Sequence, residues 1–326
     1  QPADLIVFIT DGDPTAVDSD QAGDPFYVVG KDPPNVRFNM SSGAAQTLAL
    51  NRAVEEADAA KASGSRILSV GVGNAVTGNT ASINRLKAVS GPNVATTVDQ
   101  FDLEKLFGTE GVKILHLSGL IGALSPSTSA FCVELAKAAR AHGTLVAMDL
   151  NYRATFWKGR EEELSAAFDE IAKNCDILYG NEEDFQLCLG IEGPEAGGKS
   201  IDDKIDDFKA MIGRIKEAYP NASWIGTSLR EVVSANHHKW GILLWNDGVF
   251  YLAPLRDIDV MDRIGGGDGS VGGVLYGILQ GWDVEKCAQF GWATGALAAT
   301  SFYDYGAPAD EKQVWDLWKG NARVQR

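Results

Sequence analysis

The chain has 326 residues, is 45% hydrophobic and carries a formal net charge of -15 at pH 7. This length allows one large or two moderate domains with a substantial core. The negative charge argues against nucleic acid or an anionic membrane as the main partner. No apolar run approaches the roughly 20 residues of a membrane span and no signal-peptide pattern opens the chain, so we expect a soluble, cytoplasmic protein.

The first part of the chain alternates short apolar runs with helical patterns. The expected strands cover 5–9, 66–73 and 94–97, and the expected helices cover 42–60, 80–89 and 102–107. Residues 11–40 are polar and contain Gly and Pro, which is typical of a loop. Strands that alternate with helices predict a parallel sheet with helices on its faces.

The second part of the chain continues the same alternation. The expected strands cover 113–117, 145–150, 176–179 and 224–227, followed by a hairpin over 241–252; the expected helices cover 126–142, 161–172, 205–215, 284–300 and 311–319, with one more opening at 182. We therefore expect a layered α/β/α fold with a mostly parallel central sheet.

Polar residues follow two of these strands. Asn151 and Arg153 come after the strand at 145–150, and an acidic cluster over 182–184 comes after the strand at 176–179. Ligands of open α/β sheets bind at the carboxyl ends of strands, and Arg153 is suited to bind a carboxylate. The alternatives are a surface salt bridge for Arg153 and an ordinary exposed helix start for the acidic cluster.

A glycine-rich stretch precedes the apolar run 271–279. The consecutive residues Gly265, Gly266 and Gly267 would leave backbone N–H groups unshielded at a helix start, as in a phosphate cradle. Asp268 follows directly and could accept a proton from a hydroxyl that attacks the phosphate. In the alternative reading, glycine supplies unusual backbone angles and Asp268 caps the helix.

Cysteines and histidines give little sign of a metal site. His237 and His238 are adjacent, and neighbouring side chains point in different directions, which disfavours shared metal binding. The four cysteines are far apart and form no C-x-x-C motif, so we expect buried free thiols, as in a reducing compartment. They are Cys132, Cys175, Cys188 and Cys287.

Two stretches of the first part resemble the C-terminal half of a von Willebrand factor A domain. They are LIVFITDGDPT at 5–15 and RILSVGVGNAVTGNTASINRLKAVSG at 66–91. In that family the aspartate of the I-T-D-G turn, here Asp11, helps to hold a divalent cation together with a D-x-S-x-S loop. No such loop precedes Asp11, and one carboxylate is too few for Mg²⁺, so we expect an incomplete site and a structural use of this part.

The motifs of the second part resemble those of the ribokinase-like (PfkB) sugar kinases, in particular the 2-keto-3-deoxygluconate kinase branch. They occur in family order: HLSG at 116–119, DLNYRATFW at 149–157, GNEEDF at 180–185, GTSLREVVSANHHKWG at 226–241, DRIGGGDGSVGG at 262–273 and GWATGALAAT at 291–300. Ordered motifs of this number are far more specific than one glycine loop.

The resemblance implies roles for the matched positions. Asp268 would be the base that takes the proton from the sugar hydroxyl, and the three preceding glycines would form the anion hole. The other implied ligand positions are Asn181 and Asp184 for Mg²⁺ around the nucleotide phosphates, Thr227 for the nucleotide pocket, and Asn151 and Arg153 for the substrate. A guanidinium at Arg153 would suit a sugar acid better than a neutral sugar.

The sequence also departs from the family pattern. Asp184 replaces the more common Glu, and Ser270 stands where an apolar, often aromatic, residue is expected, so that Gly269-Ser270 would weaken the first helical turn. The family's first core strands, its β lid and a sugar-recognition segment are not visible. We therefore expect a chimera of a von Willebrand A-like fragment (1–111) and a ribokinase-like part (112–326), packed as one continuous domain without a β lid. Because these kinases commonly dimerise through the lid, we expect a monomer.

Three functions follow from these observations. The first is ATP-dependent, Mg²⁺-assisted phosphoryl transfer to a hydroxyl of 2-keto-3-deoxygluconate or a related sugar acid. The second is a catalytically weak chimera that retains nucleotide binding, because a missing lid removes positioning and water exclusion. The third, a metal-dependent adhesion module, is disfavoured by the lone Asp11.

Overall fold

The computed structural model describes residues 102–195, 200–261, 265–300 and 310–320, together with five short strands and residues Asn84 and Lys87 in the first part of the chain. It divides into two compact units, Gln1–Val112 and Lys113–Arg326. Each unit is considered by itself below.

The first unit contains a parallel sheet in the order β1-β4-β5. Its strands are β1 (Leu5–Thr10), β4 (Arg66–Gly71) and β5 (Val94–Ala95). β1 and β4 pair in parallel, as do β4 and β5, so the expected strands and their parallel pairing are confirmed. The expected helix over 42–60 lies outside the described residues, and within 80–89 only Asn84 and Lys87 are described, both in helical conformation.

The loop expected over 11–40 is interrupted by two strands. β2 (Ala16–Ser19) and β3 (Val36–Asn39) pair antiparallel as a separate two-stranded sheet. Val17 lies opposite Phe38, and such β-branched and aromatic pairs favour a strand pair even beside Gly and Pro. That part of the loop prediction is wrong, whereas the absence of a β lid stays a prediction. Asp11 lies outside the described residues.

The helix expected over 102–107 begins and ends later, at Glu104–Glu110, and has wide π-type turns. The Asp102 carboxylate accepts a hydrogen bond from the backbone N–H of Lys105 at 2.8 Å, next to the helix start. An aspartate that accepts the N–H three residues along the chain caps a helix start, so Asp102 lies before the first turn and not within it.

The second unit is organised around a six-stranded sheet in the order β11-β10-β9-β8-β7-β6. The strands are β6 (Ile114–Ser118), β7 (Leu145–Asp149), β8 (Ile177–Gly180), β9 (Trp224–Ser234), β10 (His237–Asn246) and β11 (Val249–Asp259). The run β6-β7-β8-β9 is parallel, whereas β10 pairs antiparallel with both β9 and β11. The expected mostly parallel α/β sheet is confirmed.

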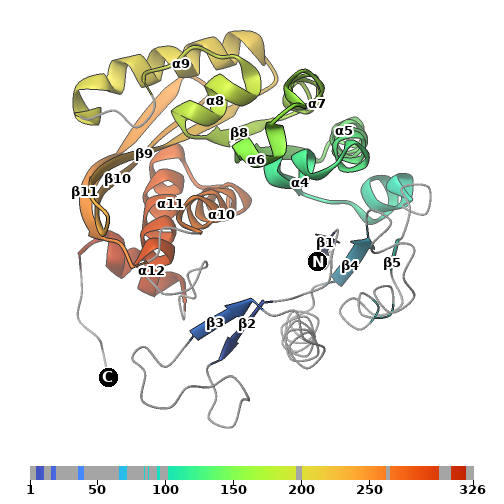
Figure 1. The fold of residues 1–326 in the computed structure, drawn as a ribbon, viewed down its shortest axis with the longest axis horizontal. Coiled ribbons are helices and arrows are strands. Elements are labelled where there is room, and N and C mark those ends of the chain that lie inside the picture. Colours follow the sequence, from blue (N-terminus) through green and yellow to red (C-terminus); the bar gives the residue numbers. More distant parts are fainter. Residues whose placement is uncertain are drawn as a thin grey trace. The chain divides into compact units, whose positions relative to one another are not determined.

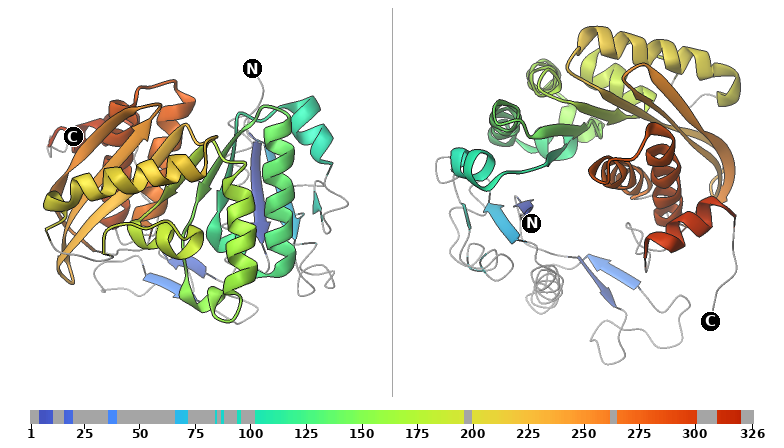
Figure 2. Two further views of the ribbon diagram at one scale, coloured as in Figure 1. Left: turned by 90° about the horizontal axis from the view of Figure 1, so that it is seen from above. Right: turned by 180° about the vertical axis from the view of Figure 1, so that it is seen from behind.

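Helices cover both faces of this sheet. They are α4 (Gly119–Leu124), α5 (Pro126–Ala141), α6 (Ala154–Trp157), α7 (Glu161–Ala172), α8 (Glu182–Leu189), α9 (Ile205–Ala218), α10 (Gly266–Leu279), α11 (Val284–Ala299) and α12 (Glu311–Trp318), with a 3-10 turn at Ile201–Lys204. Figures 1 and 2 show α5, α7 and α9 along one face and α10 and α11 along the other. The layered α/β/α prediction is confirmed. Among the described helices, none combines the length and hydrophobicity needed to cross a membrane.

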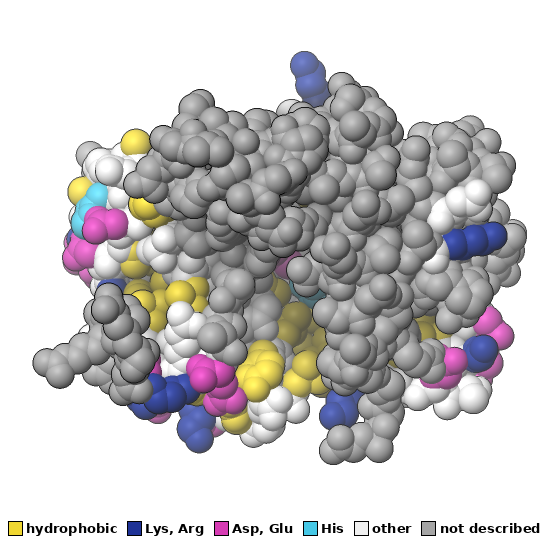
Figure 3. All heavy atoms as spheres, turned by 90° about the horizontal axis from the view of Figure 1, so that it is seen from below, with side chains coloured by type: hydrophobic (Ala, Val, Ile, Leu, Met, Phe, Trp, Pro, Cys, Tyr) yellow, Lys and Arg dark blue, Asp and Glu magenta, His cyan; other side chains and the backbone are white. Residues whose placement is uncertain are grey.

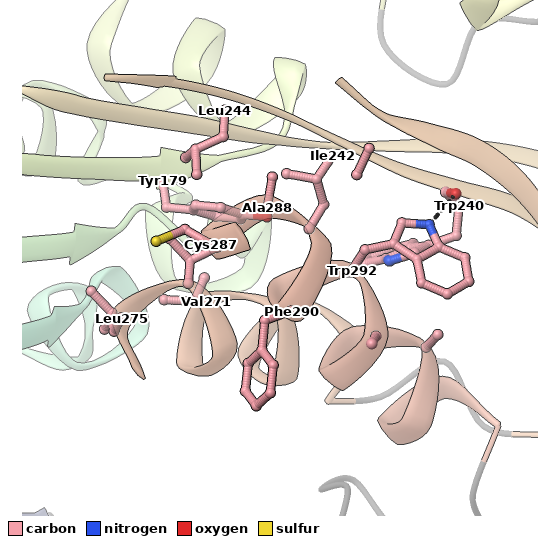
Figure 4. Packing of buried hydrophobic residues seen from close by; sticks show 14 of the residues in the cluster. Tyr179, Trp240, Ile242, Leu244, Val271, Leu275, Cys287, Ala288, Phe290 and Trp292 are labelled. Atoms are coloured by element: carbon pink, nitrogen blue, oxygen red, sulfur yellow. Dashed lines mark hydrogen bonds between the residues drawn. The ribbon is translucent and has the colours of Figure 1, made fainter. Parts of the chain in front are cut away.

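The largest part of the core lies between α10, α11 and the strands β8 to β10. Tyr179, Ile242, Leu244 and Val274 are buried in this cluster, and Figure 4 shows the side chains of the strands pointing toward those of the helices. The indole N–H of Trp292 donates to the carbonyl of Trp240 at 2.7 Å. This packing attaches α10, which carries the glycine stretch, to the sheet.

The prediction of buried free cysteines agrees with the structure. All four cysteines are free and buried, and burial raises the pKa of both Cys132 and Cys287 to about 12. His238 is buried, whereas His237 contacts Asp257 (Nε2 to Oδ1, 2.9 Å) and Asp259 (Nδ1 to Oδ1, 3.2 Å). The described residues contain no group of three His, Cys, Asp or Glu side chains that could hold a metal ion.

Acidic and basic side chains lie next to one another on the described surface (Figure 3). Lys137 pairs with Glu170 at 2.8 Å and Lys312 with Asp316 at 2.6 Å, both largely in contact with solvent. Exposed pairs of this kind contribute little to stability. Buried polar groups therefore define the site better than these surface pairs do.

Candidate active site

The polar residues that follow β7 and β8 lie at one edge of the sheet. β7 ends at Asp149 and β8 ends at Gly180, and the two strands pair in parallel. Parallel neighbours bring their carboxyl ends to the same edge, so the segment 150–153 and the start of α8 are adjacent. This is the edge at which the sequence placed the ligands.

The Asp184 carboxylate links these two segments. Its Oδ2 accepts a hydrogen bond from the N–H of Asn181 at 2.8 Å, and its Oδ1 accepts one from the N–H of Tyr152 at 2.9 Å. Asn181 Oδ1 in turn accepts from the N–H of Asp184 at 2.9 Å, so the pair forms a capping box at the start of α8. Asp184 thus closes its own helix and also fixes the segment that follows β7.

Asp184 packs closely against β8. A Cβ added to Gly180 would lie 3.0 Å from the Asp184 Cβ, so a larger residue at this strand end would press on the capping box. Asp184 is only 7% exposed. Burial raises its pKa, and this is opposed by the N–H donors of Asn181 and Tyr152 and by the charge of Arg153.

The segment after β7 is held in an unusual conformation. Asn151 has a φ of +42°, in the left-handed region that non-glycine residues seldom adopt. Its Nδ2 donates a long hydrogen bond of 3.4 Å to Ser118 Oγ, at the end of β6. Such backbone strain is common in binding sites. The exposed Arg153 donates from Nη1 to the carbonyl of Tyr152 at 2.8 Å, so the structure brings both expected substrate residues to this edge.

Asp149 is a buried acid that the sequence analysis did not single out. It is the last residue of β7 and is 7% exposed. Burial raises its pKa well above the ordinary value, and the negative charges of Asp184 and Asp268 raise it further, while Arg153 and a hydrogen bond from the Asn151 backbone lower it. Its position at the end of an apolar strand, inside the motif DLNYR, was the signal available in the sequence.

The first turn of α10 is open on one side. Gly265 precedes the helix with a φ of +79°, and its carbonyl accepts a hydrogen bond from the N–H of Gly269 at 2.8 Å. A Cβ added to Gly267 would meet nothing within 4 Å. Within the described part of the chain, the helix start therefore presents backbone N–H groups that no side chain covers at Gly267, as a phosphate cradle requires. Residues 262–264 lie outside the described part.

Asp268 is exposed on this open turn. Gly265, not Asp268, occupies the cap position, so the reading of Asp268 as the helix cap does not describe this helix. The Asp268 charge raises the pKa of Asp149 on β7. Burial lowers the pKa of His116, on β6, and the negative charge of Asp268 opposes this shift. Part of the His116 side chain is also in contact with solvent. Asp268 thus lies within electrostatic range of the ends of β6 and β7.

The other face of the turn packs closely on α11. A Cβ at Gly269 would lie 2.9 Å from the carbonyl oxygen of Thr294, and a Cβ at Gly273 would lie 2.9 Å from the Cα of Gly291. Ser270 is fully buried, and its Oγ lies 2.8 Å from the hydroxyl of Tyr179 on β8. The weak turn expected at Gly269-Ser270 is therefore anchored at both positions.

Thr227, the residue expected in the nucleotide pocket, lies on β9 beside Gly180 of β8. Its side chain is fully buried, and its Oγ1 has no hydrogen-bond partner among the described residues. A buried hydroxyl without a partner costs free energy that a ligand or water could recover. The site therefore brings together every expected position of the second unit, whereas Asp11 cannot be assigned to it.

Comparison with protein families gives one match that covers most of the chain. The model described as the pfkB family carbohydrate kinase matches residues 75–310. The match begins within the range assigned to the von Willebrand A-like fragment, and that assignment stays a prediction.

Curated relatives match more than half of the chain. A 5-dehydro-2-deoxygluconokinase of Clostridium tetani is 29% identical over 193 residues, which are 59% of this chain and 51% of the relative. The same-named protein of Clostridium perfringens strain ATCC 13124 is 28% identical over 205 residues, 63% of this chain and 53% of the relative. The chain thus aligns with about half the length of these relatives.

Solved structures share the fold. The 2-dehydro-3-deoxygluconokinase of Thermotoga maritima superposes with a TM-score of 0.68 and 21% identity, covering 98% of this chain and 99% of the other. A PfkB family carbohydrate kinase from Listeria grayi has a TM-score of 0.64 and 23% identity, and the match covers 97% of this chain and 99% of the other. A ribokinase II candidate from E. coli, in complex with ATP and Mg²⁺, has a TM-score of 0.59 and 15% identity. The match covers 98% of this chain and 99% of the other.

Proposed function

Because the chain belongs to the pfkB family of carbohydrate kinases, we propose that it transfers a phosphoryl group from ATP to a hydroxyl of a sugar acid. One observation carries this proposal. The exposed Asp268 stands on an open, glycine-lined helix start within electrostatic range of the edge that holds Asp149, Asp184 and Arg153. A phosphate cradle, an exposed carboxylate and a guanidinium are thus near one another.

The proposed reaction uses Asp268 as the base. The sugar hydroxyl oxygen forms a bond to the γ-phosphorus, the bond between that phosphorus and the bridging oxygen of ADP breaks, and Asp268 takes the hydroxyl proton. The N–H groups at the start of α10 would donate to the oxygens of the transferring group. Such donors are fixed before the reaction and stabilise negative charge in the transition state.

The described residues are suited to bind ATP and Mg²⁺ together as the substrate complex. Mg²⁺ prefers oxygen ligands and is usually held by one or two carboxylates together with substrate phosphates. No complete three-residue metal group occurs in the described part, which fits a metal that arrives with the nucleotide. Asn181 and Asp184 would orient the phosphate-bound metal, which neutralises phosphate charge, and Thr227 would face the nucleotide. The E. coli structure of the same fold holds ATP and Mg²⁺, which supports this pair of ligands.

The proposed acceptor is a sugar acid of the dehydro-deoxygluconate type. Arg153 offers an exposed guanidinium, whose paired N–H groups match a carboxylate. Asn151 precedes it in the strained segment and offers an amide for a sugar hydroxyl. The names of the C. tetani and T. maritima proteins specify kinases of such gluconates, which supports this substrate class.

The test compares Asp268→Asn with a matched control, Glu183→Gln, which neutralises an exposed acid near the same edge. Both variants and the parent are assayed with MgATP and either 2-keto-3-deoxygluconate, 5-dehydro-2-deoxygluconate or ribose. We expect turnover of a sugar acid but not of ribose, and a loss of kcat of about 10²- to 10⁴-fold in Asp268→Asn alone.

Two outcomes would contradict the proposal. Undiminished kcat in Asp268→Asn would remove Asp268 from the chemistry. Nucleotide-dependent thermal stabilisation without turnover of any acceptor would favour the alternative of a protein that binds nucleotide but is catalytically weak.

A further inference from the structure

The first turn of α10 is weak when considered alone. Glycine occupies 266, 267 and 269, and glycine favours a helical backbone less than alanine does. The cap residue, Gly265, provides no side chain to close the helix start. The direction in which Asp268 points must therefore be set by contacts with the rest of the unit.

Packing against α11 brings the two helices together but leaves the turn without a polar restraint. A Cβ at Gly266 would meet only the Ala299 Cβ at 3.6 Å and the Gly295 carbonyl at 3.7 Å. Contacts between glycine backbone and small apolar groups are non-directional. A hydrogen bond, in contrast, has a preferred distance and angle, and it can fix the rotation of the turn about the helix axis.

Ser270 provides such a hydrogen bond. Its Oγ lies 2.8 Å from the Tyr179 hydroxyl, and both side chains are buried. An α-helix advances by about 100° per residue, so residues two apart point in nearly opposite directions. An anchor on the buried side at Ser270 therefore determines where Asp268 points on the exposed side.

Tyr179 is itself rigidly held. Its ring covers Gly226 on β9, where an added Cβ would lie 2.5 Å from ring atoms Cδ2 and Cε2. Figure 4 shows the ring close to Cys287 and Ala288. Burial raises the pKa of Tyr179, so the hydroxyl keeps its proton and remains able to donate.

Tyr179 also lies next to the other half of the site. It precedes Gly180 and the capping box of Asn181 and Asp184 along the chain. We propose that Tyr179 and Ser270 are positioning residues: their buried hydrogen bond fixes the first turn of α10, and with it the Asp268 carboxyl, relative to the Asn181–Asp184 edge. This inference rests on the proposed function, in which Asp268 is the base.

The kinetic test uses Tyr179→Phe, Ser270→Ala and the double variant. The matched control is Tyr219→Phe, because the buried Tyr219 likewise donates from its hydroxyl, to Asp169 Oδ1 at 3.1 Å, but on α9's side of the unit. Loss of a net contribution of about 1 kcal/mol corresponds to a roughly fivefold to tenfold lower kcat. We expect this in each single variant, with KM for both substrates within about twofold of the parent.

The double variant separates positioning from general destabilisation. Residues that act through one shared hydrogen bond are non-additive, so the double variant should have a kcat no lower than the worse single variant. Tyr219→Phe should lower the melting temperature about as much as Tyr179→Phe does, but it should leave kcat unchanged. Equal kcat in Tyr179→Phe, Ser270→Ala and the parent would overturn the inference.

A second measurement does not depend on activity. Amide hydrogen exchange at residues 269–273, without substrates, should be faster in Tyr179→Phe and Ser270→Ala than in the parent or in Tyr219→Phe. If the parent shows no turnover but this pattern holds, the proposed function fails while the anchor is supported. If turnover is normal and exchange is unchanged in both variants, the anchor fails while the function stands.

Discussion

At the ends of β7 and β8, a carboxylate holds the backbone by hydrogen bonds. At the start of α10, glycines let the helix pack closely against α11, and one buried hydrogen bond from Ser270 to Tyr179 orients the turn. Asp184 accepts hydrogen bonds from the N–H groups of Asn181 and Tyr152 at 2.8 and 2.9 Å. Gly269 and Gly273 instead allow α10 to approach α11 so closely that added Cβ atoms would meet backbone at 2.9 Å.

The difference shows two physical ways to hold the halves of one site. A buried carboxylate gives directional restraint, but it brings a charge into low dielectric and makes the structure sensitive to pH. Close glycine packing is independent of pH but tolerates no added volume. Each half should therefore fail under a different perturbation, and the following experiments test this contrast in order of expected effect.

Adding one methyl group should damage the α10 half most. In Gly273→Ala the new Cβ would collide with the Thr294 Oγ1 and the Gly291 Cα, so we expect a loss of about 2 kcal/mol in the free energy of unfolding. Gly272→Ala is the matched control, because a Cβ there meets nothing within 4 Å. It should be neutral or stabilising by up to about 1 kcal/mol. Urea unfolding measures both, and equal effects would contradict steric packing.

Removing the Asp184 carboxylate should affect the polar half. Asp184→Ala leaves the N–H groups of Asn181 and Tyr152 without their acceptor and should lower stability by about 1 to 2 kcal/mol. The exposed Glu183→Ala, on the same turn, also replaces an acid by alanine and should stay within about 0.5 kcal/mol of the parent. Because Tyr152 precedes Arg153, we also expect a raised KM for the sugar acid. Similar stability of the two variants would show that the capping box is not an anchor.

The pH dependence should come from the polar half and be the smallest effect. Free aspartate titrates near pH 3.9, roughly, and the pKa of Asp149 in the folded protein lies well above its ordinary value because of burial. Between these values the folded state binds more protons than the unfolded state, so stability falls as pH rises. Asp149→Asn should flatten this fall, measured as melting temperature between about pH 4 and 8 in EDTA. An unchanged slope would assign the pH dependence to other groups.

Sequence patterns located those elements whose environment is uniform along their length. β7 and β8 are buried almost throughout, so their continuous apolar runs were sufficient to place them. β9 extends to Ser234, well beyond the expected 227. This extension was not predicted because residues 230–234 are mainly exposed and begin with Arg230 and Glu231. This segment is held by its pairing with β10, and the charged Arg230 and Glu231 interrupt the apolar run before Val232 and Val233.

The site was predictable where one residue type is required and less so where two distant residues combine. The glycines before Asp268 and the acid at 184 stand out because few residues can replace them in these roles. The sequence predicted a weak helical turn at Ser270, because its partner Tyr179 lies 91 residues away. Tyr179 itself was recognisable only as part of an apolar strand. Asp149 stood within a quoted motif, yet its burial depends on how β7 packs.

The buried cysteines offer a chemical way to compare the two halves of the site. Cys188 is on α8, in the polar half, and Cys287 is on α11, where a Cβ at Gly277 would lie 2.8 Å from its Sγ. Burial raises both thiol pKa values, that of Cys287 to about 12, so few thiolates exist near neutral pH. Alkylation must then wait for local opening, and labelling rates at the two thiols would report separately on how often each half of the site opens.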